Sequence, residues 1–140
     1  MRLSKRAMLA AALILVPAGG MAYRAINWHE VYPVSDTVFE VVGRVGSSAA
    51  DYWCGAGDYV RNALGYEAAR RIYIWRAIGP SESKPGKKAV QFALAPPEGA
   101  NITPGLSLST KAVGDNLMAS AAFQYCLGNS RFDPFYRRGW

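Results

Sequence analysis

Hydrophobic positions follow helical spacing in one long segment of the chain, residues 47–65. Apolar side chains recur there every three or four residues, which places them on one face of a helix. They are Tyr52, Ala56, Tyr59, Val60, Ala63 and Leu64, with Trp53 and Cys54 beside them. Ser47 or Ser48 is suited to cap the first turn, to which Asp51 adds negative charge. Gly65 is suited to end the helix, so both ends of the predicted helix are marked.

Shorter segments alternate between apolar and polar residues or are rich in β-branched and aromatic residues, as is typical of strands. The predicted segments are an edge strand or extended arm at 23–34 and strands at 37–45, 69–78, 89–95 and 106–113. In 69–78, alternation puts Arg71, Tyr73 and Trp75 on one side and Ile72, Ile74 and Arg76 on the other. The polar, turn-forming stretch 79–88 predicts that the third and fourth strands form an antiparallel hairpin with a long tip.

A second helix is predicted after the last strand, with Asp115 or Asn116 as its cap, Cys126 on it and Gly128 as its stop. The elements together predict an α+β fold. We expect a small antiparallel sheet of about four to five strands with two helices packed on one face and one disulfide.

The first 22 residues have the composition of a secretory signal peptide: a basic start, an apolar run and then small residues. We expect cleavage after Ala22, an exported domain over 23–130, and an aromatic, basic tail over 131–140. The expected location is the periplasm or the extracellular space, with retention by an uncleaved N-terminal anchor as the alternative. All ten acidic residues follow Ala22 but three of the sixteen basic residues precede it, so the mature chain carries +3. This small excess does not indicate nucleic-acid binding.

Cys54 and Cys126 are the two cysteines of the chain. In an oxidising compartment an even pair of cysteines favours a structural disulfide. The bond would close a loop of about 70 residues, for which the chain-entropy model gives about 4 kcal/mol of stabilisation.

An alternative role for Cys54 comes from the string Cys-Gly-Ala-Gly-Asp-Tyr-Val-Arg. Over about a dozen residues it resembles the helix that begins at the catalytic cysteine of NlpC/P60 and CHAP peptidoglycan hydrolases. The resemblance implies that Cys54 is a thiol nucleophile. Those families need a histidine base downstream of the cysteine, whereas His29 lies upstream. Cys54 also falls inside the predicted helix, away from the N-terminal dipole that lowers a thiol pKa.

Other polar features have structural interpretations. Gly55 and Gly57 lack the third glycine and the strand-to-helix position of a dinucleotide site, so we expect them to allow close packing of the helix. Asp51 and Asp58 lie on one helix face, but a first-turn charge and a pairing with Arg61 or Asn62 explain them better than catalysis. His29 is expected to be a solvated side chain in the N-terminal arm. We expect no catalytic residues, metal site or cofactor.

Aromatic and arginine side chains in the tail make it the expected contact surface. The residues are Phe132, Phe135, Tyr136, Arg137, Arg138 and Trp140. The string from Asp51 to Tyr59 and the Gly79-Pro-Ser turn resemble small exported proteins of alphaproteobacteria with no assigned function. We expect a noncatalytic module that binds or supports structure at the cell envelope, in contact with an envelope protein, an anionic surface or the membrane surface. Alternatives are an inhibitor of envelope hydrolases and a cysteine hydrolase of peptidoglycan that uses Cys54.

Overall fold

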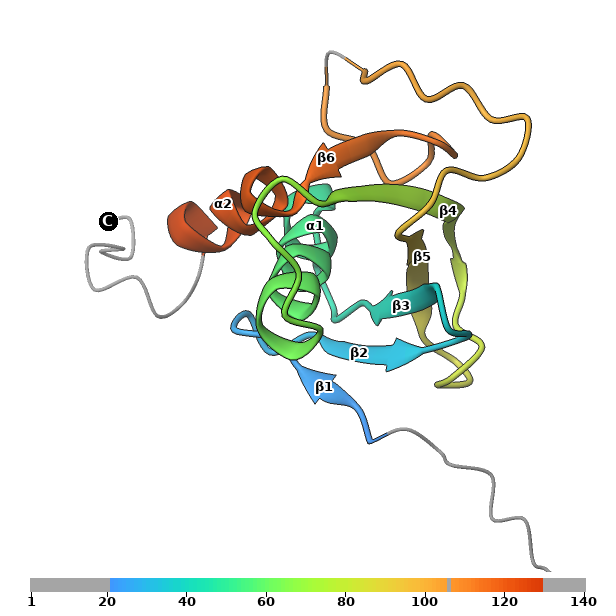
Figure 1. Ribbon diagram of the computed structural model, residues 1–140. Coiled ribbons are helices and arrows are strands. Elements are labelled where there is room, and N and C mark those ends of the chain that lie inside the picture. Colours follow the sequence, from blue (N-terminus) through green and yellow to red (C-terminus); the bar gives the residue numbers. More distant parts are fainter. Residues whose placement is uncertain (1–20, 106, 130–140) are drawn as a thin grey trace, which may run out of the picture.

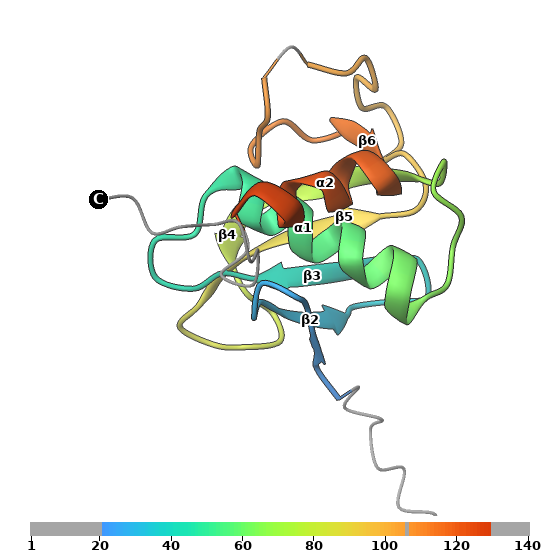
Figure 2. The same cartoon turned by 90° about the vertical axis from the view of Figure 1, so that its left-hand side faces the viewer.

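Residues 21–105 and 107–129 are described by a computed structural model of the chain. Their elements run in the order β1 (Tyr23–Arg24), β2 (Glu30–Pro33), β3 (Val38–Val42), α1 (Ala49–Asp58), η1 (Tyr59–Ala63), β4 (Arg71–Pro80), β5 (Lys88–Ala93), β6 (Asn116–Met118) and α2 (Ala119–Asn129). The six strands of this part form one antiparallel sheet in the order β1-β2-β3-β5-β4-β6. Helices α1 and α2 lie together on one face of the sheet (Figures 1 and 2). The predicted α+β architecture is confirmed, with more strands than expected.

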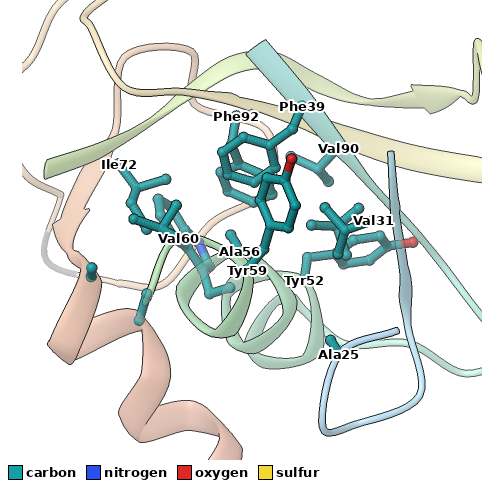
Figure 3. Packing of buried hydrophobic residues seen from close by; sticks show 14 of the residues in the cluster. Ala25, Val31, Phe39, Tyr52, Ala56, Tyr59, Val60, Ile72, Val90 and Phe92 are labelled. Carbon is teal, nitrogen blue, oxygen red and sulfur yellow. The ribbon is translucent and has the colours of Figure 1, made fainter. Parts of the chain in front are cut away.

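The core lies between α1 and the sheet. Strand alternation puts one apolar set on the helix side, and antiparallel register aligns that set across neighbouring strands. Val31, Val41 and Val90 lie in one such row. Phe39 and Phe92 lie in the next row, with their rings stacked at 5.9 Å between centroids. Figure 3 shows Val31, Phe39, Val90 and Phe92 on the helix side of the sheet, near Ala56, Tyr59 and Val60 of the helix.

Helix α1 begins as its sequence predicts. Ser48 is the N-cap, its hydroxyl accepts from the backbone N–H of Asp51, and the Asp51 carboxylate accepts from the backbone N–H of Ser48. This reciprocal pair satisfies N–H groups that have no partner within the helix. The helix continues as the π-helical turn η1 and ends before Gly65, whose φ of 73° lies in the left-handed region that favours glycine.

The disulfide between Cys54 and Cys126 joins α1 to α2, with 4.9 Å between their Cα atoms, as predicted. Two glycines of α1 allow the close approach of its neighbours. A Cβ built on Gly55 would lie 2.8 Å from a methyl of Val41, and one on Gly57 would lie 2.5 Å from the backbone N of Phe123. Close packing, and not a phosphate cradle, therefore explains both glycines in the helix.

The predictions for the C-terminal third are wrong in three places. Among residues 106–113, none of those described belongs to a strand. Asp115 and Asn116 do not cap a helix, because Asn116 begins β6 and α2 begins at Ala119. Gly128 does not end α2, which runs to Asn129. The reason is tertiary: the free edge of β4 pairs with Asn116–Met118, and the amide of Asn116 donates to the backbone oxygens of Ile102 and Gly114.

The predicted facing of Arg76 is also wrong. The register between β4 and β5 shifts between Ile74 and Arg76. Arg76 therefore pairs with Gln91 on the face opposite to Ile74, where its guanidinium donates to Glu82 at 2.8 Å. The register shift reverses the facing of the residues that follow it, up to a second shift between Arg76 and Gly79, and alternation along the sequence does not predict it.

Among the described residues, no helix is both long enough and apolar enough to cross a bilayer. Residues 1–20 of the predicted signal peptide and the whole predicted tail, 131–140, lie outside the described residues. The binding residues predicted in the tail therefore stay a prediction; they are Phe132, Phe135, Tyr136, Arg137, Arg138 and Trp140.

Candidate functional site

An open cavity of about 850 Å³ lies where three connections meet the start of α1. These connections are the β1–β2 turn, the β3–α1 connection and the tip of the β4–β5 hairpin. The lining residues are Arg24, Asn27, Trp28, His29, Glu30, Val42, Gly43, Arg44, Val45, Gly46, Ser47, Ser48, Asp51, Lys84 and Lys87. Polar and charged side chains predominate in this set, which makes it the candidate site; below it is called the polar pocket.

The β1–β2 turn presents Trp28 at the pocket. Two backbone bonds close the turn, from Ala25 N–H to the oxygen of His29 at 2.9 Å and from Trp28 N–H to the oxygen of Ala25 at 2.8 Å. Trp28 adopts a φ of 69°, which is uncommon for a residue with a side chain. Its indole is 41% exposed, and the Arg24 guanidinium lies 5.7 Å from the ring centroid. The turn thus holds a large aromatic surface beside a cation.

Asp58 fastens this turn to the helix. Its buried carboxylate accepts from the backbone N–H of Ile26 at 2.8 Å, from the Tyr23 hydroxyl at 3.2 Å and from the Asn62 amide at 2.6 Å. Burial and the neighbouring Asp58 carboxylate raise the pKa of Tyr23 to about 12, so the phenol stays a hydrogen-bond donor. The predicted pairing of Asp58 with Asn62 is confirmed.

His29 connects the β1–β2 turn to the β3–α1 connection. Its Nδ1 lies 3.2 Å from the backbone oxygen of Asn27, and its Nε2 lies 2.7 Å from Oγ of Ser47. The Asn27 amide in turn donates to the backbone oxygen of Asp51 at 2.8 Å. His29 is only 4% exposed, so the expectation of a solvated side chain in an extended arm is wrong. Burial lowers the pKa of His29, which keeps the ring neutral near pH 7.

Ser47 is half-buried at the wall of the polar pocket. Its Oγ accepts from the backbone N–H of Arg44 at 2.8 Å, and its own N–H donates to the backbone oxygen of Arg44 at 3.0 Å. The tight turn between them contains Gly46 with a φ of 80°, a conformation that suits glycine. These bonds fix the hydroxyl oxygen of Ser47 beside His29.

Four cationic side chains line the polar pocket: Arg24, Arg44, Lys84 and Lys87. The carboxylates of the lining belong to Glu30 and Asp51.

Glu30 offsets two of these cations. Its carboxylate accepts from Lys84 at 2.7 Å, from Arg24 at 3.3 Å and from the Tyr32 hydroxyl at 2.8 Å. The hydrogen bond from Lys84, followed by that from Tyr32, holds the pKa of Glu30 below its usual value, so it remains ionised. Neither Arg44 nor Lys87 forms an ion pair with a described residue. The four cations of the lining outnumber its two carboxylates, and Arg44 and Lys87 are the two cations without an ion pair to a described residue.

Glu40 positions the hairpin tip that carries Lys84. Its fully buried carboxylate accepts from the Ser81 hydroxyl at 2.7 Å and from the backbone N–H groups of Ser83 at 2.7 Å and Glu82 at 3.2 Å. Burial by itself would raise the pKa of Glu40, but the hydrogen bonds from Ser81 and Ser83 outweigh it and lower the pKa. The buried Glu40 carboxylate in β3 therefore fixes the position of Lys84 at the polar pocket.

The cysteine and carboxylate candidates of the sequence are used structurally. Cys54 is bonded to Cys126 and has no thiolate for a nucleophilic attack. Asp51 belongs to the helix cap and Asp58 to the turn attachment. In the part of the chain that the structure describes, no group of three or more His, Cys, Asp or Glu side chains is placed to hold a metal ion.

Sequence reasoning did not identify the residues of the polar pocket as a site. Trp28, Arg44, Ser47, Lys84 and Lys87 lie in connections without periodicity and come together only in the tertiary structure. The many turn-forming residues around Gly46 and Gly86 are the sequence feature that could have indicated the site, since loops carry functional groups more often than strand interiors do.

Fold and pocket together define a disulfide-closed α+β domain with a polar pocket at one end of its sheet. Comparisons of the chain with family models, with curated proteins and with solved structures found no match.

Proposed function

We propose that this protein is an exported binding module whose polar pocket takes an acidic group of an anionic polymer of the cell envelope. The observation that carries the proposal is the convergence of four cations on one open cavity, from strand β1, the β3–α1 connection and the tip of the β4–β5 hairpin. Cations gathered in a concave site raise the local concentration of anionic ligands and favour their binding.

The charges divide into a fixed pair and a free pair. Glu30 forms ion pairs with both Arg24 and Lys84, which connect β1, β2 and the hairpin tip at the pocket wall. Arg44 and Lys87 have no carboxylate partner among the described residues, so an acidic group of a ligand does not have to break an existing ion pair. The exposed indole of Trp28 adds apolar contact area next to these cations.

Export is supported by two features of the chain. The basic, apolar and small-residue order of residues 1–22 is that of a signal peptide. A disulfide between helices persists in oxidising compartments, which favours the periplasm or the extracellular space. The role of the tail as a second contact surface and the alternative of an inhibitor of envelope hydrolases stay predictions.

Binding is tested by titrating the mature protein with dextran sulfate and with uncharged dextran, followed by tryptophan fluorescence and calorimetry. We expect binding of the sulfated polymer that weakens with salt, since screening shortens the reach of charge. Charge reversal in Arg44→Glu or Lys87→Glu is expected to weaken binding by about tenfold, which corresponds to about 1.4 kcal/mol.

Lys111→Glu is the matched control, because Lys111 is an exposed cation that does not line the polar pocket. Its affinity is expected to stay within about twofold of the unaltered protein. Equal losses in the Lys111, Arg44 and Lys87 variants would show diffuse attraction by the whole surface and would overturn the pocket as the binding site. Binding of uncharged dextran with the same affinity would overturn the anionic ligand.

A further inference from the structure

The hydrogen bonds around Ser47 and His29 define the direction of proton donation. A backbone carbonyl is only an acceptor, so the contact between Nδ1 of His29 and the oxygen of Asn27 places the ring proton on Nδ1. The lone pair of Nε2 then faces Oγ of Ser47 at 2.7 Å. Because Nε2 carries no proton in this tautomer, the Ser47 hydroxyl donates to it, while Oγ accepts from the backbone N–H of Arg44.

This arrangement has the three parts of an activated nucleophile: a hydroxyl, a neutral base within hydrogen-bond distance and a group that orients the base. Asn27 is the orienting group, and its side chain is held by the backbone oxygen of Asp51. Burial lowers the pKa of His29, so the ring is a free base at neutral pH. A purely structural histidine would need the same two bonds, but here the partner of Nε2 is a half-buried hydroxyl at the wall of a cavity.

We propose that Ser47 and His29 are a nucleophile and its general base, and that the polar pocket hydrolyses carboxylic esters that carry an acidic group. This activity goes beyond the binding function proposed above and departs from the expectation of a noncatalytic module. Arg44 and Lys87 supply the preference for an acidic substituent. Asn27 acts as a positioning residue through His29.

In the first half of the reaction, Oγ of Ser47 attacks the ester carbonyl carbon while its proton moves to Nε2 of His29. The bond from carbon to the alkoxy oxygen breaks, the alcohol leaves with the proton from Nε2, and an acyl group remains on Ser47. In the second half, His29 takes a proton from water, the hydroxide attacks the acyl carbon, and the acid leaves as the proton returns to Oγ of Ser47. No oxidant or other reactant is consumed.

Negative charge on the carbonyl oxygen needs hydrogen-bond donors. The first two N–H groups of α1, on Ala49 and Ala50, have no acceptor among the described residues. They follow Ser47 closely in the chain, at the positive end of the helix dipole. They are the donors that the chain offers to an oxyanion formed at Ser47.

The test is covalent labelling of the full mature protein with an uncharged fluorophosphonate, followed by mass spectrometry of the labelled peptide. Attack by an activated serine on phosphorus expels fluoride and leaves the phosphonyl group on Oγ. We expect one label, on Ser47, and none in Ser47→Ala. The matched control is Ser107→Ala, since Ser107 is an exposed hydroxyl that does not line the polar pocket, and in this variant the label on Ser47 should persist.

The base is tested by the rate of labelling against pH. In the unaltered protein the rate should rise as His29 loses its proton and then level off, whereas His29→Gln should label about a hundredfold more slowly without that rise. Asn27→Ala keeps the backbone oxygen that accepts from Nδ1 but removes the amide that donates to Asp51, so we expect it to lower the rate without abolishing its rise with pH. Near-UV circular dichroism identifies any variant that fails to fold.

An unlabelled Ser47 in the folded, unaltered protein overturns the proposal, as does equal labelling of Ser47 in His29→Gln. Failure of the binding function is distinguishable from this result. The uncharged probe reports only on Ser47, and the dextran sulfate titration reports only on anion binding. Labelling of Ser47 without dextran sulfate binding would overturn the binding function alone, and binding without labelling would overturn the esterase alone.

Discussion

The buried side chain of His29 in the polar pocket makes a pH dependence of stability testable. Both ring nitrogens are engaged and the ring is nearly enclosed, so protonation would place a charge where little water reaches it. Burial is the largest influence on its pKa and lowers it, although the nearby Asp51 carboxylate acts in the opposite direction. The folded protein therefore binds a proton at His29 less readily than the unfolded chain does.

From this we expect the free energy of unfolding to depend on pH through His29. The neutral ring contributes its full stabilisation above the unfolded pKa of about 6.5, and this contribution is lost as the pH falls toward the lower folded-state pKa. Urea unfolding of the unaltered protein and of His29→Gln between about pH 5 and pH 8 measures the difference. A difference between the two proteins that does not change with pH would contradict the buried neutral ring.

Glu40 gives a second prediction for a single residue. Replacing the carboxylate by an amide in Glu40→Gln removes charge-assisted acceptance from Ser81 and Ser83, which we expect to cost about 2 kcal/mol or more. The control Glu30→Gln alters ion pairs at the surface and should cost less than about 1 kcal/mol. Urea unfolding near pH 7 compares the two variants. Equal costs would mean that the tip bonds of Glu40 contribute no more than surface pairs.

At the scale of elements, the contact between α1 and α2 depends on the absence of a side chain at Gly57. Alanine favours helix over glycine by about 1 kcal/mol, so propensity alone predicts that Gly57→Ala stabilises the protein. The new methyl would meet the backbone of Phe123 and Ala122, which are held by the neighbouring disulfide. We therefore expect Gly57→Ala to lower the melting temperature, by about 4–8 °C for each 1 kcal/mol lost.

Gly79→Ala is the matched comparison for this prediction. Gly79 lies in β4 with its nearest contact, the oxygen of Ala77, at an ordinary 3.7 Å and without a positive φ. Differential scanning calorimetry should show a small effect there. If Gly57→Ala raised the melting temperature, the helices would not be in the close contact described here.

Element boundaries show where local pattern was sufficient and where it was not. The helix around Trp53 and the strand around Phe39 are found where their residues predict them, because each has a complete apolar face and α1 has its own capping box. The second helix begins later than predicted because Asn116 gains more from pairing with β4 and from its buried amide bonds than from capping a helix. Pairing with the edge of β4 competes with helix capping at Asn116, and the residues around Asn116 do not reveal this distant partner.

At the scale of the whole molecule, the disulfide joins residues 72 positions apart and holds both helices on one face of the sheet. Removing it in Cys54→Ser/Cys126→Ser is expected to cost about 4 kcal/mol by the chain-entropy model. That is a large fraction of the 5–15 kcal/mol by which domains of ordinary size are stable. Urea unfolding with and without a reductant measures this quantity.

Reduction of the unaltered protein should reproduce the loss seen in the double variant, and a reductant should have no further effect on that variant. A loss below about 1 kcal/mol in both would contradict a disulfide that limits the unfolded chain.

The sequence by itself determined the α+β class, the central capped helix, the hairpin of β4 and β5 and the pairing of the two cysteines, because each follows from local periodicity, local caps or simple cysteine counting. Tertiary structure alone decided the boundaries of β6 and α2 and the composition of the polar pocket. Ser47 and His29 lie 18 positions apart, in a turn and a connection without repeating pattern. Only the packing of these loops against the start of α1 places the hydroxyl, the imidazole and the four cations around one cavity.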